Sequence, residues 1–170
     1  MYLPVDWAGK HMRLQLTGHL QTNEDAVYGA YYQARFSPNR FLTLDVNQLR
    51  LFEDLDDDID HLTITNFNLQ FSRVRKPKLD LWWGAGLMLL DRENLYGSPS
   101  LSGGFTWFFK RPLSLHAEAQ LGWPNATFAR QYQARMQVHI DRFMVYAGYQ
   151  GTKIGSVGLP NWAVGTGVWF

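Results

Sequence analysis

The feature that most constrains this chain is an alternation of apolar and polar residues that recurs from residue 12 to the C-terminus. Period two is the spacing at which successive side chains of a β-strand point to opposite faces. The segments that show it are residues 12–20, 28–36, 41–52, 62–74, 79–90, 101–110, 113–121, 132–140, 143–150 and 162–170. No segment of similar length repeats apolar residues at helical spacing. The sequence therefore predicts an all-β protein of about ten strands.

Two of these segments change phase once. In residues 41–52 the apolar positions pass from Val46 to Leu49, and in residues 62–74 they pass from Ile64 to Phe67. One extra residue in a strand produces such a change, because it moves every later side chain to the other face. The pattern therefore predicts a β-bulge in each of the two segments.

The connections between the segments differ in length. Short ones lie at residues 37–40, 76–78, 111–112 and 141–142, and mostly longer ones at 21–25, 53–61, 91–100, 124–127 and 151–161. Because the two kinds alternate along the chain, tight turns gather at one end of the sheet and long loops at the other. This is the connectivity of an antiparallel up-and-down meander, and an even strand number lets it close into a barrel.

Aromatic residues, 15% of the chain, indicate which face of the barrel is outside. On the apolar face they gather near the tight turns (Phe36, Phe109, Phe143 and Phe170) and near the long loops (Tyr28, Trp123, Phe128, Tyr149 and Trp162). Aliphatic residues lie between the two groups, with Trp83 and Trp107 as exceptions. Two aromatic rims around an aliphatic band are typical of a lipid-facing surface. The alternative is a soluble lipid-binding β-barrel, whose apolar face lines an internal cavity.

The C-terminal segment alternates up to a terminal aromatic residue, with Trp162, Val164, Thr166, Val168 and Phe170 on one face. It resembles the closing strand of bacterial outer-membrane β-barrel proteins, and the architectural resemblance covers most of the chain. In that family the terminal Phe and the alternating positions before it are the signal recognised by the barrel-assembly machinery. The resemblance implies that role for Trp162, Val164, Val168 and Phe170. Val168 departs from the family, which often has an aromatic residue there.

A chain of 170 residues has room for one domain. We expect residues 1–10 to be a periplasmic lead-in segment and residues 11–170 to form the transmembrane barrel. Residues 1–10 lack the basic start and apolar stretch of a signal peptide, so we expect a mature exported form in the bacterial outer membrane. The absence of cysteine excludes disulfides and thiolate chemistry.

The polar face supplies the candidate functional residues, which we expect to line the barrel lumen. They are Arg13, Gln15, His19, Gln33, Arg35, Asp45, Asp80, His116, Glu118, Gln133, Arg135 and His139. Long side chains of both charges can fill a narrow barrel while pairing with one another, which predicts a packed polar core. The alternative is a thin, water-filled channel of weak ion selectivity.

Catalysis is a different class of function, and its candidate residues are His116 and Glu118. They share a strand face with Ser114, as a hydrolase triad would require, but alternate residues on one strand lie about 6.5–7 Å apart. That is too far for direct hydrogen bonds, and no local motif of the lipid-modifying outer-membrane hydrolases is present. The acidic residues 53–60 place Asp54, Asp56 and Asp58 at calcium-loop spacing, but the required Gly is missing. We expect a solvated loop there, and no metal or other cofactor.

The sequence thus favours an outer-membrane barrel acting as a structural or partner-binding membrane module, with a narrow pore as a second form of that hypothesis. The expected partners are outer-membrane lipid and lipopolysaccharide, the barrel-assembly machinery, and a protein in a larger envelope complex. A formal net charge of +1 gives no general attraction to nucleic acid.

Overall fold

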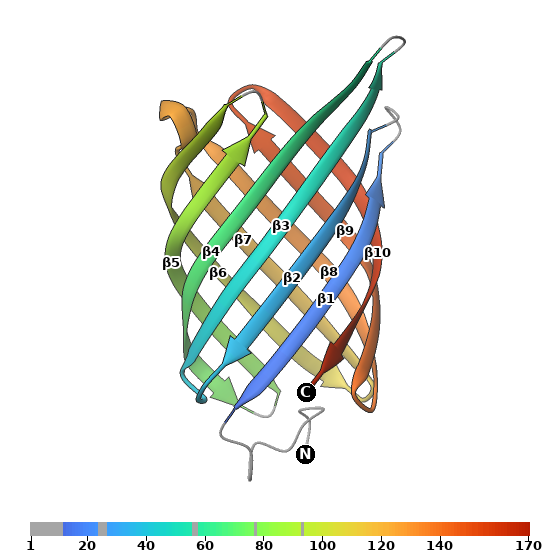
Figure 1. The fold of residues 1–170 in the computed structure, drawn as a ribbon. Helices are drawn as coiled ribbons and strands as arrows, with labels where there is room; N and C mark the ends of the chain where they lie inside the picture. Colours follow the sequence, from blue (N-terminus) through green and yellow to red (C-terminus); the bar gives the residue numbers. More distant parts are fainter. Residues whose placement is uncertain (1–11, 24–26, 56–57, 77, 93) are drawn as a thin grey trace.

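The computed structural model describes residues 12–23, 27–55, 58–76, 78–92 and 94–170, and in these residues the chain forms one closed barrel (Figure 1). Its strands are β1 (Arg13–Thr22), β2 (Val27–Ser37), β3 (Leu42–Leu55), β4 (Asp58–Lys76), β5 (Leu79–Asp91), β6 (Leu95–Lys110), β7 (Leu113–Gly122), β8 (Ala129–Ile140), β9 (Phe143–Ile154) and β10 (Val157–Trp169). A short 3₁₀ helix, η1 (Pro124–Ala126), joins β7 to β8. The predicted lead-in segment, residues 1–10, lies outside the described residues.

Each strand pairs antiparallel with its sequence neighbour, and β10 returns to pair with β1. In that closing pair Gln15 lies opposite Trp169 and Thr22 opposite Trp162. Closure removes the unpaired backbone groups of both edge strands, which would be costly in an apolar environment. The predicted all-β, up-and-down barrel of ten strands is confirmed.

The two ends of the barrel are named here by the chain terminus. The proximal end holds Phe170 and the turns that lead from an even-numbered strand to the next odd-numbered one, such as β2–β3. The distal end holds the other turns, such as β1–β2 (Figure 1). The prediction of long distal loops is wrong for the β3–β4, β5–β6 and β9–β10 connections. β3 extends to Leu55, β6 begins at Leu95, and β9 and β10 are separated by two residues. Backbone pairing continues there after the alternation of residue types has ended.

The predicted bulge in residues 41–52 is also wrong. β3 pairs with β4 without a register shift from Leu42 opposite Phe71 to Leu55 opposite Asp58. In β4 a shift does occur against β5, but between Ser72 and Val74, well beyond the change of phase. The apolar residues change phase because Leu49, Leu51 and Ile64 point into the barrel, where polar residues precede them on the same face.

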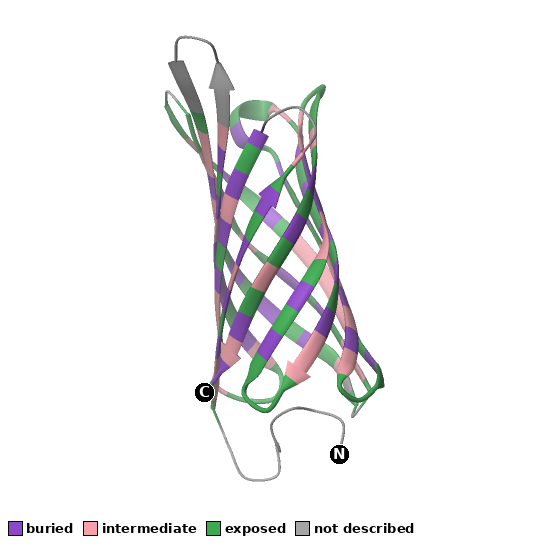
Figure 2. Cartoon of the chain, turned by 90° about the vertical axis from the view of Figure 1, so that its right-hand side faces the viewer, coloured by how far each residue is buried: buried purple, intermediate pink, exposed green. Residues whose placement is uncertain are grey.

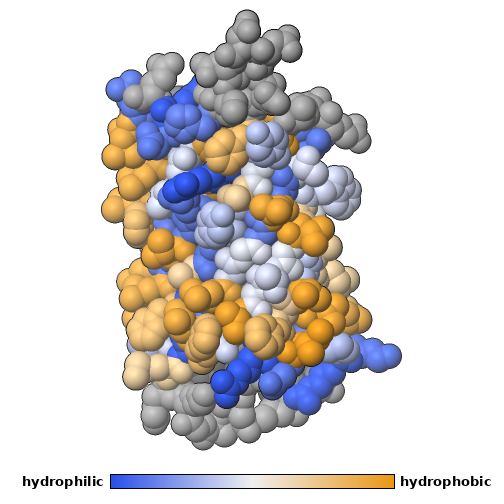
Figure 3. Space-filling view, turned by 45° about the vertical axis from the view of Figure 1, so that its right-hand side comes forward, coloured by the Kyte–Doolittle hydropathy of each residue, from blue (hydrophilic) through white to orange (hydrophobic). Residues whose placement is uncertain are grey.

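Burial alternates along the strands, with one face buried and the other exposed (Figure 2). The outer face carries large apolar side chains, such as Leu69 at 50% exposed and Val145 at 48% exposed. On the face in Figure 3, hydrophobic residues form a band around the lower part of the wall and further patches above it, with more hydrophilic residues between these patches and at both ends. The apolar side chains in the middle of the strands therefore face outward, which is the reverse of their usual arrangement in a water-soluble protein.

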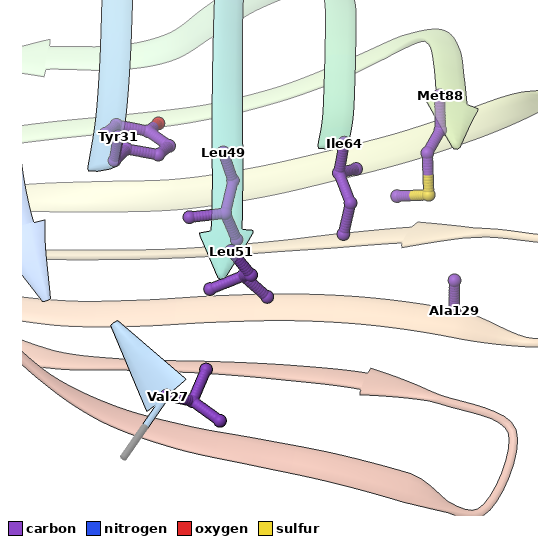
Figure 4. Packing of buried hydrophobic residues seen from close by; sticks show 7 residues of the cluster. All are labelled: Val27, Tyr31, Leu49, Leu51, Ile64, Met88 and Ala129. Carbon is purple, nitrogen blue, oxygen red and sulfur yellow. The ribbon is translucent and has the colours of Figure 1, made fainter. Parts of the chain in front are cut away.

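The distal end of the lumen contains a hydrophobic cluster, which we call the distal cluster (Figure 4). Its buried members are Val27, Tyr31, Leu49, Leu51, Ile64, Met88 and Ala129. Leu62, Leu90, Ile154 and Leu159 pack against it. On the outside of β3 and β4 at this level several side chains are polar: the Gln48 amide donates to Thr65 Oγ1 at 3.2 Å, and Arg50 is exposed. At these positions β3 and β4 are therefore apolar inside and polar outside.

Candidate functional site

The polar residues expected in the lumen lie on the inner face of the wall. Gln15, His19, Gln33, Asp45, His116, Gln133 and Arg135 are buried. Arg13, Arg35, Asp80, Glu118 and His139 are partly buried. Period-two alternation placed each of them on this face, but it carried no information about which of them meet across the lumen.

A cluster of charges lies at the middle of the lumen, with Arg35 of β2 between two carboxylates. Its Nε donates to Asp45 Oδ2 at 2.8 Å, and its Nη2 donates to Glu118 Oε2 at 2.7 Å. Arg35 and Glu118 are 83 residues apart, on strands that are not neighbours in the barrel. The ion pair therefore crosses the lumen.

The two carboxylates accept further hydrogen bonds, all from side chains on the inner face. Gln33 Nε2 and Asn47 Nδ2 donate to Asp45 at 2.7 and 2.8 Å. Gln133 Nε2 donates to Glu118 Oε1. Burial of a charge is tolerated when it is paired and its remaining lone pairs are satisfied, and this cluster meets both conditions.

Amide side chains form a second set of bridges across the lumen. Asn66 of β4 donates to Gln131 of β8 at 2.8 Å, and Gln120 of β7 donates to Asn68 of β4 at 3.2 Å. Neither pair of strands is adjacent in the barrel. Side chains of opposite walls are thus in direct contact, and the middle of the lumen is filled.

The histidines take part in the same network. His19 contacts the Tyr146 hydroxyl through Nδ1 at 3.2 Å and Gln150 Oε1 through Nε2 at 2.6 Å, and its ring stacks on Tyr31. His116 lies 2.9 Å from Thr106 Oγ1 and 3.3 Å from Glu118 Oε2.

Ser114, His116 and Glu118, the residues of the catalytic alternative, do not form one relay. Ser114 Oγ lies 2.7 Å from Nε2 of His139 and 3.1 Å from Oε1 of Gln137. His116 contacts Glu118 instead, and that carboxylate is held by Arg35. The hydroxyl and the imidazole–carboxylate pair belong to separate contacts.

Small hollows remain inside the barrel, and two of them lie at different levels. The first, of about 50 Å³, lies in the proximal half and is lined by polar residues, Phe108 and two tryptophans; its lining includes Arg13, Arg35, Asp80, Arg135, Trp82 and Trp169. The second, of about 130 Å³, lies at the distal end and is mostly apolar, with Val27, Leu51, Leu62 and Leu159 in its wall. We call the first the proximal cavity.

Metal ligands do not gather in the described part of the chain: no group of three or more His, Asp or Glu side chains could hold an ion there. The side chains of residues 53–60, where calcium-loop spacing was noted, lie outside the described residues. Nor does any helix among the described residues have the length and apolar character to cross a membrane.

The outer face carries the two predicted aromatic rims. Near the distal end Trp123 packs on Phe128 and Tyr149 on Trp162, with ring centroids 5.6 and 5.7 Å apart. The sequence places Trp83 and Trp107 between the rims as exceptions. The structure places them toward the proximal end instead, since Trp107 pairs with Leu79 at the start of β5 and Trp83 packs on Phe71. Strand tilt, which the sequence does not show, brings them to that level.

The residues of the expected assembly signal lie on the outer face of β10. Trp162 and Val164 are each 69% exposed and Phe170 is 55% exposed, while Val168 is partly buried. They form the apolar side of the strand that closes the barrel against β1.

Sequence reasoning missed the distal cluster and the cross-lumen pairing of Arg35 with Glu118. The signal for the cluster was present in the phase changes at Leu49 and Ile64. The pairing across the lumen had no sequence signal, because it depends on how far each strand is staggered around the closed barrel.

A closed antiparallel barrel with an apolar, aromatic-rimmed exterior and a polar interior is the organisation of an outer-membrane β-barrel, and the chain has this organisation. Solved structures similar to it include two outer-membrane proteins. They are the N-terminal β-barrel domain of Pseudomonas aeruginosa OprF (12% identity, 93% of this chain and 97% of that one, TM-score 0.45) and Ail, the attachment invasion locus protein of Yersinia pestis (12% identity, 94% and 96%, TM-score 0.42). No protein-family model and no curated protein sequence matches the chain.

Proposed function

We propose that this protein is a structural or partner-binding module of the bacterial outer membrane, with a lumen closed to solutes. The observation that carries the proposal is the filling of the lumen at two levels. Side chains of opposite walls bond directly at Asn66–Gln131 and Arg35–Glu118, and the distal cluster packs above them. A barrel filled in this way anchors and presents its surface rather than transporting a solute.

Membrane lipid is the expected environment of the outer face, whose aliphatic band lies between the aromatic rims. Contact with lipopolysaccharide is supported by a pair of basic residues on the outer face near the distal end. Arg130 of β8 lies opposite Lys153 of β9 in the strand pairing, close to the aromatic pairs of the distal rim. Two adjacent cations at this level suit the phosphate groups of a lipid headgroup.

A protein partner would find its most prominent docking element in the β3–β4 hairpin, whose pairing continues to Leu55 opposite Asp58 (Figure 1). Val27, the first residue of β2, pairs with Glu53, so the hairpin extends past its neighbour. Removal of residues 54–59 should leave a folded barrel but abolish a photo-cross-link from this hairpin to the partner. A cross-link elsewhere on the barrel would contradict this assignment.

Conductance in planar lipid bilayers tests the closed lumen. The intact barrel should give no steady single-channel current, whereas the triple variant Leu49→Ala, Ile64→Ala, Met88→Ala should conduct because it empties the distal cluster. The matched control, Leu44→Ala, Leu69→Ala, Leu87→Ala, removes the same kind of side chain from the outer face and should stay silent. Large, steady currents through the unmodified barrel would establish the narrow-pore alternative.

Recognition by the barrel-assembly machinery is the proposed role of Trp162, Val164, Val168 and Phe170. It is supported by their place on the strand that closes the barrel. Deletion of residues 168–170 should abolish insertion in cells, measured as heat-modifiable protein in the outer-membrane fraction. Deletion of residues 1–10 is the control and should have the smaller effect. Equal insertion of both truncated forms would contradict the assignment.

A further inference from the structure

Arg135 of β8 is the starting point for an inference beyond this proposed function. Its side chain is almost fully buried, at 3% exposed. None of its nitrogens Nε, Nη1 and Nη2 has a hydrogen-bond partner among the described residues. A buried guanidinium without acceptors is costly, since desolvation of a charged donor is not offset by any bond.

The neighbouring carboxylates do not serve Arg135 because they are already engaged. Asp45 and Glu118 both accept hydrogen bonds from Arg35, and the glutamines Gln33 and Gln133 donate to the same carboxylates. Arg135 instead lies over the ring of Tyr146, with its Cζ 4.6 Å from the ring centroid. This contact with the ring face orients the guanidinium.

The proximal cavity, which Arg135 lines, contains further donors without partners. Trp82 and Trp169 are buried in its wall, and neither indole N–H has a hydrogen-bond partner among the described residues. An indole nitrogen can only donate, and so can a guanidinium. The unmatched groups of Arg135 and these tryptophans therefore all require an acceptor.

The charge of the cavity wall points in the same direction. Its charged lining residues are three arginines, Arg13, Arg35 and Arg135, and one carboxylate, Asp80. The carboxylates that hold Arg35 lie outside this lining. Arg35 is balanced by those two carboxylates, so the guanidinium that lacks a hydrogen-bonded carboxylate among the described residues is that of Arg135. Water could satisfy its N–H groups one by one, but an anion also pairs with its charge.

The size of the cavity limits the ligand. Its volume of about 50 Å³ is several times what one water molecule needs on the same measure, about 10–15 Å³. A chloride with a water, or an oxyanion no larger than phosphate, fits this space. Arg13, Ser37 and Trp169 in the wall come from strand ends, so the cavity extends toward the proximal mouth.

We propose that the proximal cavity is a binding site for one small inorganic anion, held by the Arg135 guanidinium with the Trp82 and Trp169 indole N–H groups around it. The anion completes the polar interior of the barrel and stabilises the folded state in proportion to its occupancy. The site is reached from the proximal mouth and is independent of whether the distal end conducts.

Thermal unfolding of the detergent-folded protein tests the site. Sodium chloride is exchanged for sodium gluconate, whose anion is too large for the cavity, at constant ionic strength, and phosphate is titrated in a second series. The unfolding midpoint should rise by several degrees and saturate with chloride or phosphate, and the arm with the lower half-saturation identifies the preferred anion. No saturable rise in either series overturns the proposal.

The variant Arg135→Gln should lose the saturable rise, whereas Arg130→Gln should keep it, since Arg130 is an exposed arginine of the same strand. Retention of the full rise in a folded Arg135→Gln protein overturns the proposal. If Arg135→Gln does not fold, crystals of the unmodified protein soaked in bromide provide the test. An anomalous peak beside Arg135 is expected, and a cavity without one overturns the site.

Discussion

The two ends of the barrel interior are built on opposite principles. In the middle and proximal part, Arg35, Asp45 and Glu118 form a charged network inside an apolar wall. At the distal end Leu49 and Ile64 pack inside a wall that carries Arg50 and Gln48 on its outside. The same strands, β3 and β4, pass through both arrangements without a break in their pairing.

The difference teaches where the surroundings of the barrel change. A strand with lipid outside needs an apolar outer face, whereas a strand with water outside needs an apolar inner face. The inversion at Leu49 and Ile64 therefore marks the level at which β3 and β4 leave the apolar layer. At this level Leu49, Leu51 and Ile64 pack into the distal cluster together with residues of β2, β5 and β8.

The largest expected effect comes from the charged network. Glu118→Ala leaves Arg35 with one carboxylate instead of two and removes one of the two acceptors of Gln133, and it should destabilise the barrel by about 3–5 kcal/mol. Urea unfolding in lipid vesicles measures the loss. Asp91→Ala, at an exposed carboxylate, is the control and should change stability by less than about 0.5 kcal/mol. A loss at Glu118 no greater than at Asp91 would mean that the network contributes nothing.

The distal cluster should respond to lost volume rather than to lost charge. Leu49→Ala opens a cavity among fully buried side chains and should cost about 2–5 kcal/mol in the same unfolding assay. Leu44→Ala, on the outer face of the same strand, should cost less because lipid can fill the space. Equal losses at the two positions would show that the distal cluster is loosely packed, and the contrast between the two ends would fail.

Alternation along the strands was sufficient to predict the closed barrel and the inner or outer face of residues such as Gln33 and Leu69. It was not sufficient at Leu49, because a change of apolar phase has two physical causes. An inserted residue moves all later side chains to the other face of the strand. A change in the surroundings leaves every side chain on its face but places the apolar residues on the opposite face from that point on. Only the strand register, continuous from Leu42 to Leu55, separates the two.

The contacts of the interior were beyond sequence reasoning for a different reason. Arg35 and Glu118 were both expected in the lumen, but their ion pair is set by the shear of a closed barrel. The sequence predicts loops at the distal strand ends because regular alternation stops there, although the backbone ladder of β9 and β10 continues to Ile154 and Val157. The alternation of apolar and polar residues indicates what surrounds the two faces of a strand, but it does not indicate how far the strand extends.

The outer face gives the third prediction, since the contrast inside depends on lipid outside. Met136 of β8 is 46% exposed, between Tyr132 near the distal rim and Ile140 at the proximal end of the strand. Met136→Arg should cost about 2–4 kcal/mol in vesicles because it places a charge in the apolar layer. The native Arg130, near the distal rim, shows that the same strand accepts arginine outside that layer. Full tolerance of Met136→Arg would argue for a soluble barrel.

The smallest expected effect lies where the two parts of the interior meet, at His19. One face of its ring stacks on Tyr31 of the distal cluster, with centroids 4.6 Å apart, while its nitrogens contact Tyr146 and Gln150 of the polar part. His19→Phe keeps the stacking but leaves the Gln150 amide oxygen without this partner, so it should cost about 1–3 kcal/mol. His19→Gln can still bond to Gln150 but loses the stacking. If His19→Phe proves the more stable of the two, packing dominates at the boundary, and the distal cluster effectively extends to His19. If His19→Gln proves the more stable variant, hydrogen bonding dominates, and the polar network ends at His19, where it meets the distal cluster.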